Sequence, residues 1–325
     1  MLRFVSRAVA TLALVAATGA FADSQYPTKP VTIIVPFAAG GPTDTVARTI
    51  AAAMQKSFGQ TLIIENVGGA GGTLGADKVA KASNDGYTLL LHHIGMSTAP
   101  ALYRNLRFKP TEDFEPIGEV ADVPMVFIGR ADLQPNNFKE LLAYIKKNGD
   151  KVNYGNAGIG SASHLCGLLF MSTIQVEMTT VPYKGTAPAM NDMLGGTLDV
   201  MCDQTTNTTS QIKAGKVKAY GATTPKRIAS LPNIPTLDEE GIKGFEVSVW
   251  HAIYAPKGTP KPVIDKLVAS LQEGLKDPTV KARFAELGTE PVAQGRATPE
   301  SLKKHLKSEI DRWTPIIQKA GQYAD

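Results

Sequence analysis

Hydrophobic and polar residues alternate along this 325-residue chain in blocks that fit short strands or amphipathic helices. Apolar, β-branched runs predict strands at 31–35, 62–66, 87–92, 125–128, 152–154, 177–181, 200–203, 217–223 and 246–254. Between them, helix-start signals predict helices that begin near Thr43, Thr73, Asn137, Ser161, Ala187 and Thr206. From Lys261 onward the pattern predicts helices almost throughout. This alternation is typical of an α/β fold.

The predicted elements fall into two blocks, followed by a helical return. We expect the chain to cross between the blocks near residues 123–124 and again near residues 244–249. This predicts a first lobe of residues 23–124 and 248–325, and a second lobe of residues 125–247. Each lobe would contain an open sheet flanked by helices, with a central ligand cleft at the carboxyl ends of the strands.

Two glycine-rich loops each connect a predicted strand to a predicted helix. Residues 31–45 read VTIIVPFAAGGPTDT, and residues 152–170 read VNYGNAGIGSASHLCGLLF. A strand that turns through glycines into a helix points backbone N–H groups and the positive end of the helix dipole at one spot. We therefore expect an anion there, and the two loops could hold one small acid from opposite sides.

The N-terminus has the three parts of a secretory signal peptide. Arg3 and Arg7 are followed by a short apolar stretch and by an Ala-Phe-Ala cleavage site at residues 20–22. We expect residues 1–22 to be removed, and no later stretch is apolar enough for stable membrane insertion. The sequence thus predicts an exported, periplasmic protein.

Charge argues against several classes of partner. Loss of Arg3 and Arg7 would take the formal charge from +4 to +2, since no other charged residue lies in residues 1–22. So small a charge does not indicate a nucleic acid or a membrane surface as partner. The roughly 300 remaining residues exceed the usual length of a single domain, in agreement with two lobes.

Cys166 and Cys202 are the only cysteines. In an oxidising compartment such a pair commonly forms a disulfide. The alternative is two buried free thiols, because cysteine also packs as a small hydrophobic residue. The sequence leaves both open, whereas nothing near either residue indicates a catalytic thiolate.

The sequence motifs that would indicate an enzyme are less complete than those that indicate a binding protein. Residues 95–99, GMSTA, miss the G-x-S-x-G elbow of a serine hydrolase at the last position, although His251 and an aspartate could complete a triad around Ser97. Pro100 disfavours the strand-to-helix turn that such an elbow needs. Residues 158–163 miss the dinucleotide fingerprint at its third glycine, and the histidines and cysteines lack zinc-ligand spacing. We expect no enzyme activity, cofactor or metal, and keep a secreted serine hydrolase as the alternative.

The motifs together resemble the periplasmic receptors of tripartite tricarboxylate transporters, also called the Bug family. The matching segments span the mature chain in order: YP at 26–27, PFAAGG at 36–41, EN at 65–66, GGAGG at 68–72, DGYT at 85–88, NAGIGSASH at 156–164, VPYKG at 181–185 and YAPKGTP at 254–260. The resemblance implies a two-lobed, type II-like binding protein that closes on a carboxylate and delivers it to transporter membrane subunits. A monomer is expected.

The resemblance also implies which residues bind the ligand. From the first lobe these are Ala39, Gly40, Gly41, Thr43 and Asp44; from the second lobe they are Ala157, Ser161, Ser163, His164 and Asp203. Phe37, His93 and Tyr183 join these candidates as aromatic residues that could line the cleft. Each has a structural alternative. The glycines could simply form a turn, the hydroxyl and carboxylate residues could cap helices, and His164 or Tyr183 could be packed in the core.

Specificity should come from the less uniform positions. The histidines at 92–93, together with Phe37, Tyr183 and Trp250, could line the cleft, although each could also serve only packing. Their rings favour, weakly, an aromatic mono- or dicarboxylate over an aliphatic acid. Asp203 would repel a bare anion and would act through water or in specificity.

Overall fold

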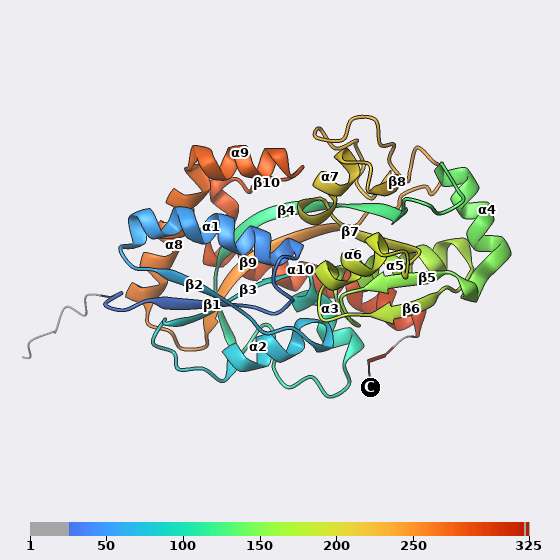
Figure 1. The fold of residues 1–325 in the computed structure, drawn as a ribbon. Coiled ribbons are helices and arrows are strands. Elements are labelled where there is room, and N and C mark those ends of the chain that lie inside the picture. Colours follow the sequence, from blue (N-terminus) through green and yellow to red (C-terminus); the bar gives the residue numbers. More distant parts are fainter. Residues whose placement is uncertain (1–25, 322, 325) are drawn as a thin grey trace, which may run out of the picture.

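The computed structural model describes residues 26–321 and 323–324, so the expected signal peptide at 1–22 lies outside the described residues. Strands and helices alternate as two lobes (Figure 1). In that view the first lobe, built from the blue to teal and the orange to red segments, lies at the left and centre, with α10 reaching to the right, and the green and yellow second lobe lies at the right.

The strands form a ten-stranded sheet with a first and a second half. The first half has the order β2-β1-β3-β9-β4, and β10 pairs with β4 on its other side. The second half has the order β4-β7-β5-β6, and β8 also pairs with β4. The strands are β1 (Val31–Val35), β2 (Leu62–Asn66), β3 (Thr88–His93), β4 (Phe114–Arg130), β5 (Asn153–Asn156), β6 (Thr179–Pro182), β7 (Val200–Gln204), β8 (Val217–Ala222), β9 (Ser248–Pro256) and β10 (Glu290–Pro291).

Strand β4 belongs to both halves. Its pairing with β9 ends at Pro124 opposite Ser248, and its pairing with β7 begins at Met125 opposite Gln204. The two lobes therefore share one continuous strand. The chain returns to the first lobe through the segment between β8 and β9.

Helices cover both halves of the sheet. They are α1 (Pro42–Phe58), α2 (Thr73–Ala80), α3 (Gly95–Leu102), α4 (Phe138–Asn148), α5 (Ala162–Ile174), α6 (Thr186–Leu194), α7 (Thr205–Lys213), α8 (Lys261–Lys276), α9 (Pro278–Glu286) and α10 (Pro299–Ala320), with short 3-10 turns at Ala70–Gly72, Gly149–Lys151 and Gln294–Arg296. Several caps agree with the sequence: the side chain of Asn137 accepts from Glu140 N–H, and that of Thr298 accepts from Ser301 N–H.

Two elements differ from the sequence-based expectations. The first half of β4, before Met125, carries Pro116, Gly118 and two register shifts, which hide the alternation typical of a strand. Helix α3 follows β3 almost directly and contains Pro100, so the expectation that Pro100 opposes a strand-to-helix turn is wrong. The helix tolerates the lost N–H because packing fixes it in place, α3 being nearly all buried.

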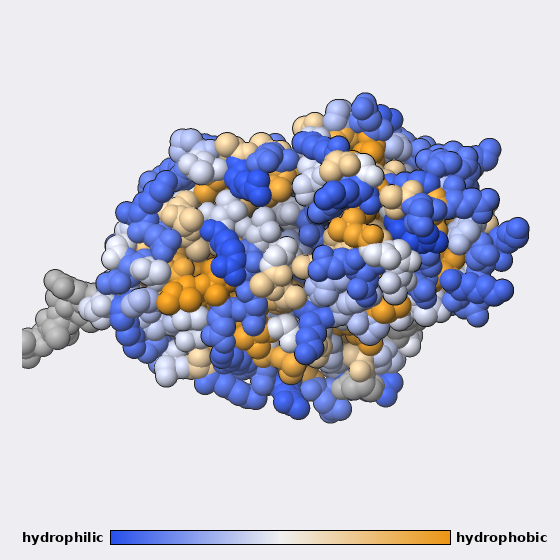
Figure 2. Space-filling model, in the orientation of Figure 1, coloured by the Kyte–Doolittle hydropathy of each residue, from blue (hydrophilic) through white to orange (hydrophobic). Residues whose placement is uncertain are grey.

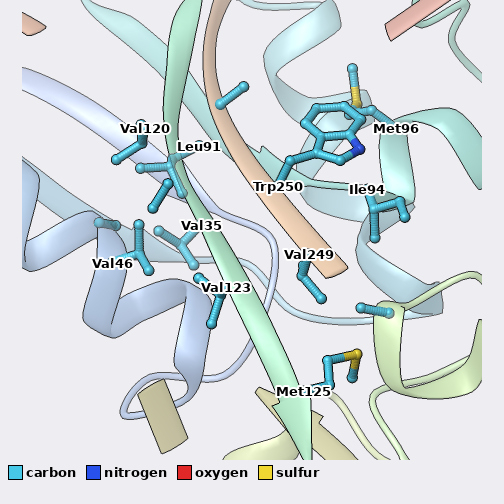
Figure 3. Close-up of a cluster of buried hydrophobic side chains, with 14 of the residues drawn as sticks. Val35, Val46, Leu91, Ile94, Met96, Val120, Val123, Met125, Val249 and Trp250 are labelled. Atoms are coloured by element: carbon cyan, nitrogen blue, oxygen red, sulfur yellow. The ribbon is translucent and has the colours of Figure 1, made fainter. Parts of the chain in front are cut away.

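The hydrophobic core is continuous across the shared strand. Val123 and Met125 are both fully buried on either side of Pro124 and belong to one cluster with Val249 and Trp250 (Figure 3). The exterior shown in Figure 2 is mostly hydrophilic, with smaller apolar areas between the polar residues. This core supports the strand switch from which the two lobes extend.

The structure confirms the disulfide between Cys166 and Cys202, whose Cα atoms are 6.1 Å apart. Cys166 lies in α5 and Cys202 in β7, next to Asp203. The bond thus ties the helix that follows the second glycine-rich loop to the strand that carries Asp203.

Candidate functional site

A small cavity lies where the carboxyl ends of strands from both lobes meet. Its walls come from the β1 and β3 ends in the first lobe and from the β5 and β7 ends in the second, and they consist of Phe37, Pro42, Thr43, His93, Ala157, Ser161, Ala162, Ser163, Thr186, Asp203 and Gln204. About 10 Å³ is open to the centre of a water molecule, roughly what one water needs. A larger ligand therefore enters only when the walls move apart.

Four helices begin at this cavity. The lining residues include the first residues of α1 and α5, residue Thr186 at the start of α6, and Gln204, which caps α7. The first N–H groups of a helix have no partner within it, and the helix dipole adds positive potential there. The cavity is therefore suited to an anion, even without a lysine or arginine among its lining residues.

The first glycine-rich loop is shaped by Asp44. This carboxylate accepts hydrogen bonds from Gly40 N–H at 2.9 Å, from Arg48 at 2.8 Å and from Asn66 at 3.0 Å. Burial alone would raise the pKa of Asp44, but these bonds outweigh it and hold the pKa below its usual value. Asp44 thus stays ionised and fixes the loop, while Gly40 supplies the left-handed turn, with φ of 76°.

The second loop is held by its own side chains. Ser163 Oγ accepts from Ala157 N–H at 2.9 Å, and Ser161 Oγ accepts from His164 N–H at 3.2 Å. The two hydroxyls lie 3.1 Å apart, so the bond between them uses only one of their two hydrogens. One hydroxyl hydrogen therefore remains to donate into the cavity.

Asp203 is fully buried at the opposite wall. Burial raises its pKa to about 6, against the lowering effect of a hydrogen bond from Asn207 at 2.6 Å. Among the described residues, Asp203 Oδ1 and Gln204 Oε1 are buried without a hydrogen bond of ordinary geometry, although the Thr186 hydroxyl and the Gln204 backbone lie close enough to Asp203 to lower its pKa. This end of the cavity thus offers acceptors, whereas the helix termini offer donors.

Three buried histidines lie at the first-lobe wall: His92 and His93 contact Phe37, and His251 contacts His93. Burial lowers the pKa of His92 to about 3 and of His251 to about 4, and it holds the pKa of His93 well below its usual value. His93 Nδ1 accepts from Gly95 N–H at 2.9 Å, so the neutral ring carries its proton on Nε2. His93 therefore has an N–H to donate.

The structure brings together many of the residues expected from the sequence, but not all. Phe37, Thr43, His93, Ala157, Ser161, Ser163 and Asp203 line the cavity, whereas Ala39, Gly40, Gly41, Asp44, His164 and Tyr183 do not belong to its lining. The Tyr183 hydroxyl donates instead to Asp192 at 2.7 Å, and Trp250 donates to Glu309 at 3.2 Å.

Sequence reasoning missed Pro42, Ala162, Thr186 and Gln204 as lining residues. Pro42 and Ala162 adjoin residues that were chosen, so adjacency alone could have included them. Thr186 and Gln204 begin helices whose starts were expected one or two residues later. The convergence of these helices on one point depends on the sheet order, which no local signal gives.

The alternative of a serine hydrolase finds no support at Ser97. This side chain is fully buried, and its hydroxyl donates to Ile94 O at 2.7 Å. The His251 ring instead forms hydrogen bonds with Val249 O and with the Thr43 hydroxyl. The described residues also contain no group of three metal-ligand side chains, and no described helix is long and apolar enough to cross a bilayer.

Comparison with known proteins decides the family. The model for the tripartite tricarboxylate transporter family receptor matches residues 46–322. The chain belongs to this family. A protein of Agrobacterium vitis, described as a UPF0065 protein in the TAR-I ttuE-ttuC' intergenic region, is 54% identical over 301 residues, covering 93% of this chain and 87% of the relative.

Solved structures agree with the two-lobed fold. The periplasmic binding protein BugD is 56% identical with a TM-score of 0.90, over 92% of this chain and 99% of that chain. MatC of Rhodopseudomonas palustris, solved with bound malate, is 39% identical with a TM-score of 0.87, over 90% of this chain and 100% of that chain. This chain is thus a member of a family of solute-binding receptors of the periplasm.

Proposed function

We propose that the chain captures a small organic carboxylate between its lobes and delivers it to the membrane subunits of a tripartite tricarboxylate-type transporter. The observation that carries the proposal is the convergence of four helix N-termini from two lobes on one buried cavity. Such termini stabilise a carboxylate without a buried cation. Residues 1–22 would direct export to the periplasm.

The lobes in this proposal are residues 23–124 with 248–325, and residues 125–247. The change of pairing partner along β4 supports the first boundary, because β9 is left at Pro124 and β7 is joined at Met125. A ligand that bonds to both lobes would stabilise the closed arrangement, since only unequal contact with two states can shift their populations.

The ligand carboxylate would lie against the first N–H groups of α1 and α5. Thr43, Ser161 and Ser163 are the lining residues that carry hydroxyl groups at these two helix starts. The hydroxyl hydrogen left over between Ser161 and Ser163 would add a charge-assisted bond. His93 Nε2–H would approach the same anion from the first lobe.

The rest of the ligand would face Asp203 and Gln204. Because both side chains present an unpaired acceptor, an acid that carries a hydroxyl or ammonium group suits this end better than one with only carbon there. MatC, a structural neighbour, is solved with malate, which is a hydroxy acid. We therefore propose a short aliphatic acid with a hydrogen-bond donor.

An aromatic acid, the weak preference from the sequence, stays untested. Phe37 and His93 line the cavity and would suit a ring. Tyr183 and Trp250 do not line it, and their polar atoms bond elsewhere.

Calorimetric titration of the mature protein tests the proposal. The matched acids are succinate, malate and aspartate, which differ only in the group on one carbon, with adipate and benzoate as a longer and an aromatic acid. Succinamide is the uncharged control. We expect at least one acid to bind, malate or aspartate to bind more tightly than succinate, and succinamide to fail. Equal binding of succinamide, or none of any acid, would contradict the proposal.

A further inference from the structure

The two lobes also contact each other directly, outside the cavity. Tyr103 OH donates to Ile159 O at 2.7 Å, and Thr98 Oγ1 donates to Gly160 O at 2.9 Å. Ala38 N–H donates to Lys184 O at 3.0 Å. In each bond the first lobe donates and a backbone carbonyl of the second lobe accepts. We call these six residues the closing interface; none of them lines the cavity.

Glycines let the backbones of the two lobes meet at the closing interface. A Cβ on Gly71 would lie 1.8 Å from Ile159 O, and one on Gly158 would lie 2.8 Å from Gly71 N. Similarly, a Cβ on Gly68 would lie 2.6 Å from Lys184 O. These atoms are backbone and cannot turn aside as a side chain can. A side chain at Gly71 is therefore incompatible with the closed arrangement but not with separated lobes.

The closing interface engages the loop that forms the second-lobe wall of the cavity. Ile159 and Gly160 lie between Ala157 and Ser161, which both line it. Bonds to their carbonyls fix the orientation of these peptides. Tyr103 and Thr98 thus position the second-lobe loop relative to the first lobe without touching the space where an acid would lie.

We propose that the closing interface holds the lobes together for part of the time without any ligand, and thereby sets the affinity for all ligands by a common factor. The apparent affinity of a protein whose competent arrangement is partly populated falls with that population. Tyr103, Thr98 and Gly71 are therefore positioning residues. Ligand selectivity lies with the cavity residues instead.

The test uses Tyr103→Phe and Gly71→Ala in the mature protein. Tyr103→Phe removes the neutral hydrogen bond to Ile159 O and should weaken the binding of succinate, malate and adipate alike, by about two- to tenfold each. Gly71→Ala should weaken the binding of the same three acids by at least about tenfold. Small-angle X-ray scattering without ligand should give a larger radius of gyration for both Gly71→Ala and Tyr103→Phe than for the wild type.

Matched controls separate this effect from strain. Gly59→Ala places alanine at φ of 82°, like the φ of 60° at Gly71, but with no atom within 4 Å of the added Cβ. Tyr144→Phe removes a hydroxyl from α4, outside the closing interface. Both controls should keep the wild-type affinity and radius of gyration. Circular dichroism confirms that each variant folds, and Tyr103→Phe carries the test if Gly71→Ala does not.

Three results would overturn the proposal: an unchanged radius of gyration in a folded Gly71→Ala or Tyr103→Phe, unchanged affinities, or a changed order of the acids. The affinity measurement rests on the proposed carboxylate function, but the scattering measurement does not. If no acid bound the wild type, the proposed function would fail, and scattering alone would still decide whether the closing interface holds the lobes together.

Discussion

Ser163 Oγ accepts the backbone N–H of Ala157 at 2.9 Å, so one side chain at the start of α5 fixes the loop that ends β5. Ser163 lines the cavity, and so does Ala157. The same hydroxyl lies 3.1 Å from Ser161 Oγ. It therefore holds the loop and shares with Ser161 the one hydroxyl hydrogen that remains for the proposed carboxylate.

Ser163→Ala should weaken the binding of every carboxylate by a similar factor. Loss of a hydrogen bond to a charged group costs about 1.5 to 3 kcal/mol, or roughly ten- to a hundredfold in dissociation constant. Calorimetric titration with malate and succinate measures it. Ser308→Ala is the control, since that exposed hydroxyl on α10 donates to His305 O, away from the cavity lining. Equal affinity of Ser163→Ala and the wild type would show that the acid lies elsewhere.

Asp203→Asn should lower the selectivity among ligands and raise the stability of the fold. The variant amide keeps an oxygen for Asn207 and turns an N–H group toward the cavity. The affinities for malate and aspartate should therefore fall by about tenfold or more relative to the affinity for succinate. Calorimetric titration of the three acids gives the ratio. An unchanged ratio would exclude contact between Asp203 and the ligand's donor.

The stability of Asp203→Asn should depend on pH in a defined direction. Burial raises the pKa of Asp203 to about 6, so its protonated form stabilises the folded state at low pH, and this contribution is lost as pH rises through 6. The variant should therefore exceed the wild type in free energy of unfolding by about 1 to 3 kcal/mol at pH 7.5. At pH 4 the difference should be much smaller. Urea unfolding at both pH values checks this, and a difference independent of pH would contradict it.

The buried histidines should make the fold acid-sensitive. The pKa of His251 falls from 6.5 to about 4 on burial, so the folded state resists protonation that the unfolded chain accepts. Stability is then fully present above pH 6.5 and is lost as pH falls toward 4, by roughly 3 kcal/mol for this one group. Unfolding of His251→Gln and the wild type at pH 7 and pH 4.5 measures the effect. The variant should lose less stability on acidification, and an equal loss would exclude His251 as a source.

Removal of the disulfide should weaken both the fold and the site. Cys166 and Cys202 are 36 residues apart, and a loop of that length corresponds to about 2 to 4 kcal/mol. The double variant Cys166→Ala, Cys202→Ala should lose that much free energy of unfolding in urea. It should also bind acids more weakly, because α5 and Asp203 are no longer tied together. Wild-type stability of the variant, or of the reduced protein, would contradict this.

A structural feature could be predicted from the sequence only where its signal lies within a few neighbouring residues. Both glycine-rich loops could be predicted, because strand, turn and cap signals lie within a few residues, and the Ser161 cap is found as expected. The approach of Thr186 and Gln204 to Thr43 could not, since it depends on the order of strands in the sheet. The direct bond between Tyr103 and Ile159 likewise joins residues 56 apart, and although Ile159 lies in the second glycine-rich loop, Tyr103 belongs to none of the motifs found in the sequence.

Misleading local signals explain the remaining differences. Pro116 and Pro124 interrupt the pattern of β4, although that strand is central to both lobes. Pro100 argued against a tight strand-to-helix turn after β3, but α3 nevertheless follows β3 almost directly and packs against α10. The rings of Tyr183 and Trp250 suggested an aromatic cleft, but their polar atoms bond to Asp192 and Glu309.

The most direct test of the central claim is a crystal structure of the mature protein with bound malate. We expect one malate carboxylate within hydrogen-bond distance of the N–H groups at the starts of α1 and α5, including those of Thr43 and Ser163. The malate hydroxyl should face Asp203 Oδ1 or Gln204 Oε1. A malate bound outside the cavity between the lobes, or with its carboxylate turned away from both helix starts, would contradict the account.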